Sequence, residues 1–597
     1  MRADKPTQAR EVWHERHRVA LTVTACAVPL YFVWWAVFAT GGGDLAAQVA
    51  WAEFAKMYPG SAYNLFWYGG LHAANYSLMS PYLMAAVGVV ATTMLSGVTA
   101  TVFGAELVAR TGVRKPLWPA MAVGFSLWCQ VISGRSTFVL GTAFGMAAVL
   151  AVVSGRSARH LGAAAVCATL ATTGSPVAGL FALVVGAAYF LSRDWGRAAA
   201  LLVPPVAVVG VTTLLFPFEG EQPMPLARIG LPVVLCAIVV LTAPSAWRTL
   251  RLGAAVYAAG VVLCYLIPTP IGTNVERLSE LAAPATLLAI MMYRAEGRRP
   301  GQEPGGEQER EPGGEPGREP DGEAAPVSAP APAPRLTLPL PWFTHRRSMV
   351  ALGLAMVIAV SWLSGKTIAD IVTNTSVPEW AVKTDGVVNE LKRLGAEQTR
   401  VEVVPARDHR EAAILAPYIN MARGWNRQAD VERGRLFYEG HGGTEEPEGG
   451  FSAEAYKAWL SQWAVGFVVL VNGEPDGPAK LEHALVTSGP DYLQPVWEDA
   501  NWKIYRVKNA TPLVDKPASV VSSDGANLVV RMPRAGEVTV RIAYSPWLWA
   551  ENGCLTDDGE FTKLTVEQPG NVRISSAYGG PSRETALECE MEADETQ

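Results

Sequence analysis

The chain has 597 residues, of which 50% are hydrophobic and only 17% are charged. A soluble globular protein carries about 25% charged residues, so this composition argues against a purely soluble enzyme and favours a membrane protein. Lys and Arg number 49 against 55 Asp and Glu, which gives a net charge of −6 and disfavours a nucleic-acid partner.

Apolar stretches that can cross a bilayer recur along the first 365 residues. We predict about eleven transmembrane helices, several of them shorter than the roughly 20 residues of an ideal crossing. The first is read as a retained span rather than a signal peptide, because it is long and lacks a clear cleavage site. The stretches are residues 19–39, 81–109, 117–132, 138–153, 161–173, 177–191, 198–216, 229–243, 254–267, 278–293 and 349–364.

Positive charge alternates between the two ends of these spans. Cations in clusters mark one set of ends: Arg10, Arg16, Arg18, Arg110, Arg114, Lys115, Arg156, Arg159, Arg193, Arg197, Arg248, Arg251, Arg294, Arg298 and Arg299. The opposite ends carry single cations at Lys56, Arg135, Arg228 and Arg277. Because positive loops stay in the cytoplasm, we predict a multi-pass cell-membrane protein with a cytoplasmic N-terminus and an extracytoplasmic C-terminal domain.

Composition divides the chain into five regions. A transmembrane core, 1–296, precedes a Gly/Pro/Glu-rich segment, 297–347, that is typical of a disordered cytoplasmic linker. A last transmembrane helix, 348–365, leads into the tail. Strand-like segments and an amphipathic helix predict an extracytoplasmic α/β domain over 366–510, and short alternating segments predict a β-sandwich-like domain over 511–597.

The seven cysteines include no C-x-x-C pair, so no structural metal cluster is expected. Five of them lie inside apolar runs. Cys554 and Cys589 lie in the tail, where an oxidising compartment allows a disulfide, although two unpaired thiols would fit the sequence equally well.

Polar residues at the outer span ends are the first candidates for function, because ionisable groups are costly near hydrocarbon. The loop after the first span places Asp44 behind three glycines, ahead of an aromatic segment that contains Tyr68 and His72. Such a mixture of carboxylate, aromatic and polar groups suits a sugar. Arg135 and the pair Glu276 and Arg277 lie at later outer ends, where two arginines and a carboxylate can hold a lipid-linked phosphate and activate a hydroxyl.

These features together resemble the GT-C superfamily of polyprenyl-phosphate-sugar glycosyltransferases, which includes actinobacterial arabinofuranosyl- and mannosyltransferases. The architecture is similar over nearly the whole chain, but only the segments GGGDLAAQ and NVERL carry similarity at the level of motifs. The resemblance implies a GT-C-like catalytic core over 1–296, a polyprenyl-phosphate-linked sugar as donor, and an envelope glycan, lipid or protein as acceptor.

The resemblance also assigns roles to residues. Asp44 takes the place of the catalytic acid that deprotonates the acceptor hydroxyl or helps to bind a divalent metal, while Arg277 and Arg135 meet the donor phosphate. Many relatives have two adjacent acids, whereas Asp44 stands alone and Glu53 lies a helical turn or more away, so metal use stays open. The remaining substrate-binding candidates are Tyr68, His72 and Glu276, with Arg423 and Trp425 as acceptor-binding candidates.

Each of these residues also has a purely structural interpretation. Asp44 fits an N-cap of the following helix, His72 a buried loop histidine, and Arg277 a salt bridge with Glu276 or Glu280. Arg135 fits a headgroup cation, and Arg423 and Trp425 fit a domain interface. At the level of the whole protein, the alternatives are a multi-pass transporter, because the loop 104–116 resembles one of the major facilitator loops, and a non-catalytic envelope-assembly protein.

Overall fold

The computed structural model describes residues 5–217, 220–222, 224–295, 345–425, 431–438 and 450–578. Side chains are described from residue 17 onward, except at 345–347, 431–432 and 438. Residues 297–344 of the predicted linker, 297–347, lie outside the described residues.

Each of the eleven predicted spans falls on a helix. The second is divided at Gly88, whose φ of +97° separates two helices. The bundle consists of α1 (Lys5–Val33) with its π-helical end η1 (Trp34–Phe38), α4 (Ser80–Val87), α5 (Val89–Ala109), α6 (Leu117–Ile132), α7 (Ser136–Ser154), α8 (Ala158–Gly174), α9 (Pro176–Leu191), α10 (Trp195–Leu215), α11 (Leu226–Thr242), α12 (Arg248–Leu266), α13 (Glu276–Ala295) and α14 (His345–Asn374).

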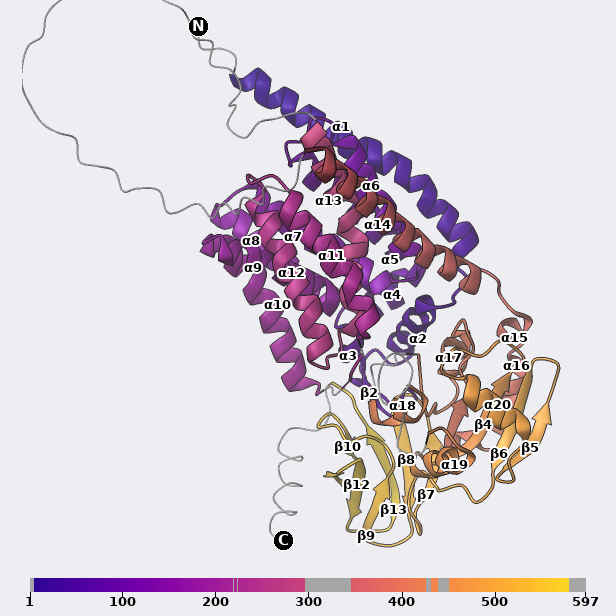
Figure 1. The fold of residues 1–597 in the computed structure, drawn as a ribbon. Coiled ribbons are helices and arrows are strands. Elements are labelled where there is room, and N and C mark those ends of the chain that lie inside the picture. The colour runs from indigo at the N-terminus through magenta and orange to yellow at the C-terminus, as the bar shows by residue number, and fades with distance from the viewer. Residues whose placement is uncertain are drawn as a thin grey trace, which may run out of the picture.

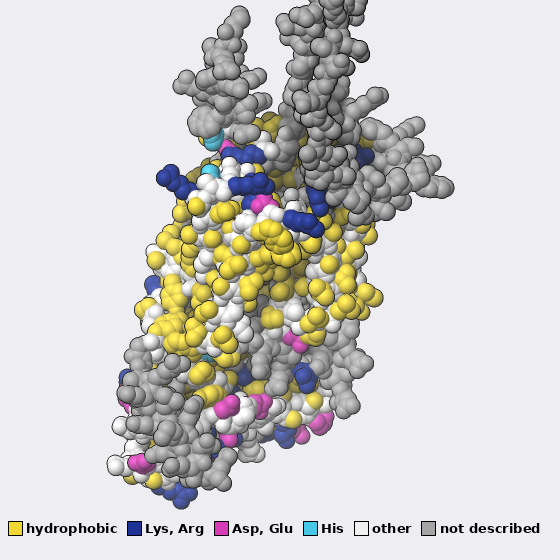
Figure 2. Space-filling view, turned by 90° about the vertical axis from the view of Figure 1, so that its left-hand side faces the viewer, with side chains coloured by type: hydrophobic (Ala, Val, Ile, Leu, Met, Phe, Trp, Pro, Cys, Tyr) yellow, Lys and Arg dark blue, Asp and Glu magenta, His cyan; other side chains and the backbone are white. Residues whose placement is uncertain are grey.

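Six of the described helices are long and apolar enough to cross a membrane, which supports a membrane protein. Three further apolar helices, α6, α9 and α11, are shorter. The number of crossings therefore stays a prediction. In Figure 1 the helices form one bundle, with α1 and α14 along one side. Figure 2 shows a band of hydrophobic side chains on the face drawn, below an upper rim that carries Lys and Arg.

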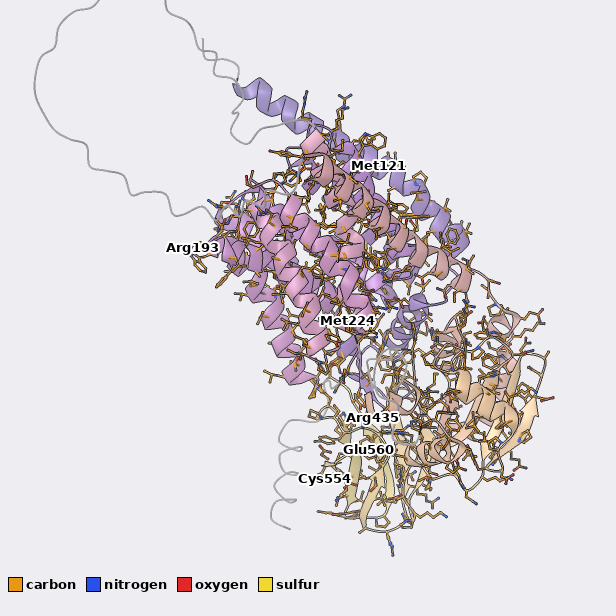
Figure 3. All side chains as sticks on the ribbon, in the orientation of Figure 1. Met121, Arg193, Met224, Arg435, Cys554 and Glu560 are labelled. Atoms are coloured by element: carbon orange, nitrogen blue, oxygen red, sulfur yellow. The ribbon has the colours of Figure 1, made fainter. Side chains whose placement is uncertain are left out.

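The tail docks at one end of the bundle. Arg193, from one of the cation clusters, lies at the end of the bundle far from Cys554 and Glu560 in the tail (Figure 3). At the other end the indole of Trp547 in the tail donates a hydrogen bond to the Leu215 carbonyl, 2.6 Å away. The side of the membrane on which the tail lies stays a prediction.

An α/β unit follows α14. Its helices are α15 (Glu379–Val382), α16 (Asp385–Arg393), α17 (Arg410–Leu415), α18 (Val431–Tyr438), α19 (Ala453–Gln462) and α20 (Lys480–Ser488), with a short 3-10 turn, η3 (Ala396–Gln398). Its sheet has the order β3-β4-β6-β5, from β3 (Arg400–Val403), β4 (Val465–Val471), β5 (Leu493–Glu498) and β6 (Trp502–Val507). All seven residues of β4 are buried, as expected for the apolar run VGFVVLV in a central strand.

Two antiparallel sheets complete the described tail and share one core. One has the order β10-β13-β8-β7 and the other β11-β12-β9. Alternating burial along β8 and β12 gives each strand one face in that core. The strands are β7 (Ser519–Ser523), β8 (Asn527–Met532), β9 (Gly536–Val540), β10 (Trp549–Ala550), β11 (Cys554–Asp558), β12 (Phe561–Val566) and β13 (Gly570–Ser575). Cys554 is disulfide-bonded, whereas Cys589 lies outside the described residues.

The segment between α1 and α4 joins the bundle to the tail. It contains α2 (Asp44–Met57), β1 (Tyr63–Asn64), β2 (Leu71–His72) and α3 (Ala73–Tyr76), and α2 lies between the bundle and the tail in Figure 1. Contrary to the expectation of an open sugar-binding surface, residues 61–74 of this segment are buried. Phe66 belongs to the core of the two-sheet unit and Trp67 to the core of the α/β unit, because large aromatic side chains gain most by leaving water.

Candidate functional site

A charged cluster lies where the bundle meets the tail. Asp44 is the first residue of α2, Arg135 directly precedes α7, and Arg277 is the second residue of α13. Oδ2 of Asp44 lies 3.8 Å from Nε of Arg135 and 3.6 Å from Nη2 of Arg277. The Asp44 side chain is 34% exposed, so a ligand can reach it. The topology thus brings together three residues that the sequence analysis selected from distant loops.

Glycines make this approach feasible. Gly134 has φ +71°, and a Cβ atom there would lie 2.7 Å from the backbone nitrogen of Leu45. Gly43 has φ +63°, and a Cβ atom there would collide with the side chain of Asn374. Only glycine fits both the left-handed backbone and the close contact at these two positions. Gly134 therefore lets the start of α2 approach the loop that carries Arg135, and Gly43 lets it approach the end of α14.

The N-cap alternative for Asp44 does not match the geometry. The N-cap residue of α2 is Gly43, and no side chain caps this helix through a hydrogen bond. Asp44 instead lies in the first turn, where a carboxylate is favoured by the partial positive charge of a helix N-terminus. Its carboxylate is turned toward Arg135 and Arg277 rather than toward the backbone of its own helix.

A second layer of ion pairs supports Arg135. Nη1 of Arg135 lies 2.5 Å from Oε2 of Glu280 and donates to Oε1 of Gln130 at 2.7 Å. Gln130 in turn donates to Glu280 at 3.0 Å. The Glu280 side chain is only 1% exposed. Glu280 therefore orients Arg135 from behind and does not face a ligand.

Glu276 also belongs to this supporting layer. Its Oε2 lies 2.5 Å from Nζ of Lys366 and 3.3 Å from Nη1 of Arg228, and its side chain is 4% exposed. Glu276 was expected to bind substrate, and the structural alternative for Arg277 was a salt bridge with Glu276 or Glu280. The geometry instead joins Arg277 to Asp44 and ties Glu276 to Lys366 and Arg228, so Glu276 has no free face toward a ligand.

Two charged residues of α14 were missed by the sequence analysis. The predicted last span ends at residue 365, but α14 continues to Asn374 and carries Lys366 and Asp370 into the cluster. Oδ2 of Asp370 accepts a hydrogen bond from the Ser133 hydroxyl at 2.5 Å, two residues before Arg135. Their spacing could have revealed them: Lys366 and Asp370 are four residues apart and directly follow the apolar run. If the helix continues, such residues lie on the same helix face.

Tyr76 forms the aromatic side of the cluster. Its ring stacks on Trp51 of α2 with centroids 5.8 Å apart, and its hydroxyl accepts a hydrogen bond from the Gln48 amide. Burial, and to a lesser extent the charge of Asp44, raise the pKa of Tyr76 above its ordinary value. The hydroxyl therefore stays protonated beside Asp44.

The other two residues of the outer loop lie outside the charged cluster. His72 is 3.2 Å from the Ser545 hydroxyl, and its ring packs edge-on against Tyr63 and Phe216. Burial lowers the pKa of His72 to about 4, so the ring is neutral at neutral pH. Tyr68 is buried and donates its hydroxyl to the Gly424 carbonyl at 2.9 Å. These contacts account for both residues through packing between the loop and the tail.

Arg423 lies inside the α/β unit rather than on a ligand-facing surface. It is 3% exposed, its guanidinium forms ion pairs with Glu402 and Glu482, and it lies 3.5 Å from the centroid of the Phe437 ring. Trp425 is half-buried, and its ring stacks on His409 with centroids 3.4 Å apart. Of the two acceptor-binding candidates, only Trp425 keeps an exposed edge.

The residues at Asp44 do not fit a divalent metal ion. Such an ion prefers several oxygen ligands, but both guanidinium groups already face Oδ2 of Asp44. Glu276 and Glu280 are engaged by Lys366. Within the described residues, no group of three His, Cys, Asp or Glu side chains is placed to hold a metal. The described charges around Asp44 therefore do not form a site for a divalent metal ion.

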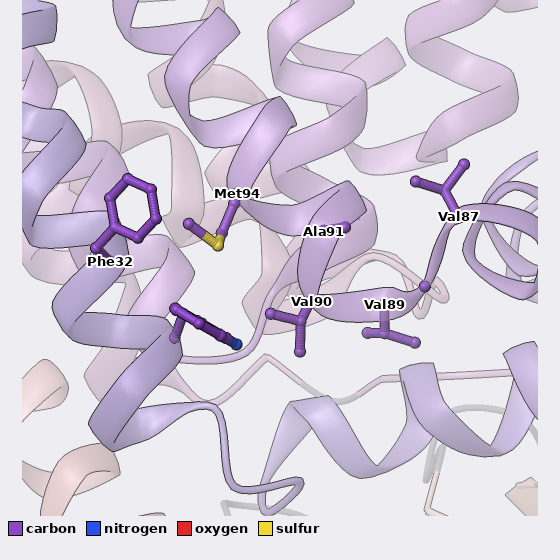
Figure 4. Close-up of a pocket in the computed structure, with 8 residues that line it drawn as sticks. Phe32, Val87, Val89, Val90, Ala91 and Met94 are labelled. Carbon is purple, nitrogen blue, oxygen red and sulfur yellow. The ribbon is translucent and has the colours of Figure 1, made fainter.

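A pocket of about 500 Å³ lies between the end of α1 and the junction of α4 with α5 (Figure 4). Its wall consists of apolar side chains and one glycine: Phe32, Trp35, Val87, Gly88, Val89, Val90, Ala91 and Met94. Val89, Val90 and Met94 pack against the same apolar group as Leu45, the neighbour of Asp44. Such a lining suits an apolar chain and contributes no charged group.

Comparisons with known proteins are sparse. Residues 515–552, which include the four strands β7 to β10, match a family described as a domain of unknown function (DUF8823). A search of curated proteins found no match. A search of solved structures matched the cryo-EM structure of the arabinofuranosyltransferase AftD from Mycobacteria, with 14% identity and a TM-score of 0.41. The match covers 87% of this chain and 41% of the AftD chain, so this chain spans less than half of that protein.

Proposed function

We propose that the protein is a membrane glycosyltransferase that transfers a sugar from a polyprenyl-phosphate donor to an extracytoplasmic acceptor of the cell envelope. The observation that carries this proposal is the partly exposed carboxylate of Asp44, which faces the guanidinium groups of Arg135 and Arg277. A carboxylate can take the proton of a hydroxyl, and guanidinium groups pair strongly with phosphate. Glycosyl transfer from a lipid phosphate needs both functions within one site.

In the proposed reaction Asp44 accepts the proton of the acceptor hydroxyl while the hydroxyl oxygen forms a bond to the anomeric carbon. The bond between that carbon and the phosphate oxygen breaks, and its electron pair stays on the phosphate. Arg277 stabilises the negative charge that develops on the phosphate. Its side chain is 20% exposed, and its ion pair with Asp44 is long at 3.6 Å, so the guanidinium can also bind a phosphate. Arg135 is held by Glu280 and Gln130, so it contributes from a fixed position.

The tail is the proposed acceptor side. The backbone nitrogen of Gly43 donates to the Asp408 carbonyl at 2.7 Å, next to Asp44. Nη2 of Arg410 donates to the Thr40 hydroxyl at 2.7 Å and to the Asn374 carbonyl at 2.6 Å. The loop that holds Asp44 is therefore fixed by the tail. Trp425 lies in the same unit and provides a partly exposed aromatic edge, which suits the C–H face of a sugar.

The transporter alternative predicts ionisable residues near the middle of the bundle, where substrate and coupling ions bind. The cluster at Asp44 lies instead at the tail end of the described helices, among α2, α13 and the start of α7. This position favours chemistry at the membrane surface over passage through the bundle.

The test is transfer by the purified full-length protein in nanodiscs, with a panel of radiolabelled polyprenyl-phosphate sugars and envelope acceptors. We expect Asp44→Asn to lose transfer while remaining folded. Glu53→Gln is the matched control, because Glu53 lies on the same helix but is 41% exposed and 3.7 Å from Lys56. Full transfer by Asp44→Asn would refute the role of Asp44, and substrate flux in proteoliposomes without turnover of any donor would favour the transporter.

A further inference from the structure

Lys366 is a cation with two carboxylate partners behind the cluster. It lies on α14, outside the segment 5–295 that forms most of the bundle. Its Nζ is 2.5 Å from Oε2 of Glu276 and 2.7 Å from Oε1 of Glu280, and it lies 4.5 Å from the centroid of the Trp362 ring. Its side chain is 26% exposed, whereas both carboxylates are almost fully buried.

The two glutamates need this cation. A buried carboxylate is costly unless it is paired and hydrogen-bonded. Arg135 compensates one oxygen of Glu280 but also faces Asp44, and Arg228 reaches Glu276 from a half-exposed position at 3.3 Å. Without Lys366, Glu280 would depend on Arg135 alone for a cation, so the excess negative charge of the two glutamates would draw the Arg135 guanidinium away from Asp44 and repel an incoming phosphate.

We infer that Lys366 is a positioning residue of the site: by neutralising Glu276 and Glu280, it leaves Arg135 oriented toward Asp44. This inference rests on the proposed function. It places a residue of the last helix behind the reacting groups, where it acts on Asp44 only through Glu280 and Arg135.

The same helix connects the site to the tail. The Asn374 carbonyl at the end of α14 accepts hydrogen bonds from Arg410 of the tail and from the Thr40 hydroxyl, both at 2.6 Å. The α14 helix is thus fixed at its end, about two turns after Lys366. This attachment fixes the position of Lys366 along the bundle axis. The geometry of the site therefore depends on correct docking of the tail.

The experiment compares Lys366→Met, Lys366→Arg, Glu280→Gln and the double variant Lys366→Met/Glu280→Gln in the full chain in nanodiscs. The measurements are affinity for polyprenyl phosphate by native mass spectrometry, thermal stability, and KM and kcat for the donor. Lys383→Met is the matched control, because Lys383 is 63% exposed and pairs with Glu379 within one turn of helix at 3.2 Å.

We expect Lys366→Met to weaken polyprenyl-phosphate binding and donor kcat/KM by about tenfold, while Lys366→Arg keeps most of both. The double variant should recover part of the loss, because the Glu280→Gln substitution removes part of the excess negative charge. A purely structural role predicts that binding and kcat/KM follow thermal stability in every variant, whereas a positioning role predicts losses larger than the change in stability explains.

Two results would overturn the inference: Lys366→Met behaving like Lys383→Met, or a double variant no better than Lys366→Met. If the unmodified protein turns over no donor but binds polyprenyl phosphate in a Lys366-dependent way, the proposed function fails and the positioning role stands. If the unmodified protein binds no polyprenyl phosphate, both fail.

Discussion

Replacing Arg423 with Met gives a direct test of how the α/β unit is held together. Arg423 is 3% exposed, and its partners Glu402 and Glu482 are 0% exposed. Nη2 of Arg423 lies 2.6 Å from Oε2 of Glu482, and the guanidinium also binds Oε1 of Glu402. The variant would leave the buried acidic side chains of Glu402 and Glu482 without their shared cation, while the apolar Met would keep contact with the Phe437 ring.

The size of the effect follows from burial. Removing one partner of a buried ion pair costs about 3–5 kcal/mol, because the remaining charge is left uncompensated. For a unit of roughly 200 residues, each kcal/mol lowers the melting temperature by about 2–4 °C. We therefore expect the apparent melting temperature of the tail to fall by about 6–20 °C.

The assay is tryptophan fluorescence of the full chain in nanodiscs during heating at one fixed scan rate. Arg393→Met is the matched control, because Arg393 forms an ion pair of 2.5 Å with Glu390 but is 68% exposed, and we expect no measurable shift. A fall of less than about 2 °C for Arg423→Met would refute this reasoning, because it is what a surface arginine would give.

Four other perturbations have predicted outcomes. Burial and the neighbouring charge of Glu482 raise the pKa of Glu402 above its ordinary value, although Arg423 opposes the shift. The folded tail then holds a proton that the unfolded chain has lost, so its stability should fall as the pH rises from about 4.5 toward the raised pKa. In melting curves recorded at several pH values, Glu402→Gln should flatten this slope. Gly134→Val should reduce transfer without removing any charge, because a side chain at φ +71° would also push against Leu45; transfer equal to that of the unmodified protein would contradict this. The tail made alone, 366–597, should lack cooperative unfolding by circular dichroism, because Phe66 and Trp67 of the missing loop fill its cores. Transfer should persist in EDTA, because two guanidinium groups rather than acidic ligands face Asp44; loss of transfer with recovery on adding Mg²⁺ would refute that.

Much of the helical region could be predicted from the sequence. Apolar runs set the approximate position of each helix, and the helix over Leu117–Ile132 has the predicted bounds. The ends were less predictable where polar residues continue a helix. The predicted last span ends at residue 365, but α14 continues to Asn374 and carries Lys366 and Asp370. The helix can continue because these two charged side chains have partners in the bundle.

The candidate site was predictable only in part. Position at one end of the bundle follows from topology, and this was enough to select Asp44, Arg135 and Arg277. The pairing among them was not predictable, because the choice of Glu280 as partner of Arg135, and of Asp44 as partner of Arg277, depends on side-chain distances across separate helices.

The outer loop shows why composition alone misleads. Its aromatic residues and His72 fit a sugar-binding surface and a packed interface equally well. The difference lies in what covers them: the backbone nitrogen of Leu65 donates to the Gly525 carbonyl at 2.8 Å, and that of Ala62 donates to the Ser576 carbonyl at 2.8 Å. Those partners lie far away in the sequence, so no local pattern reveals them. The same reason explains why Arg423 was read as a binding residue.

The most direct test of the central claim is the stoichiometry of the reaction. The full-length protein in nanodiscs would be given a doubly labelled polyprenyl-phosphate sugar and an envelope acceptor, and both products would be measured by mass spectrometry. A glycosyltransferase centred on Asp44 releases one polyprenyl phosphate for each sugar attached, and Asp44→Asn yields neither product. Release of polyprenyl phosphate without sugar on the acceptor, or equal yields from Asp44→Asn, would contradict the account.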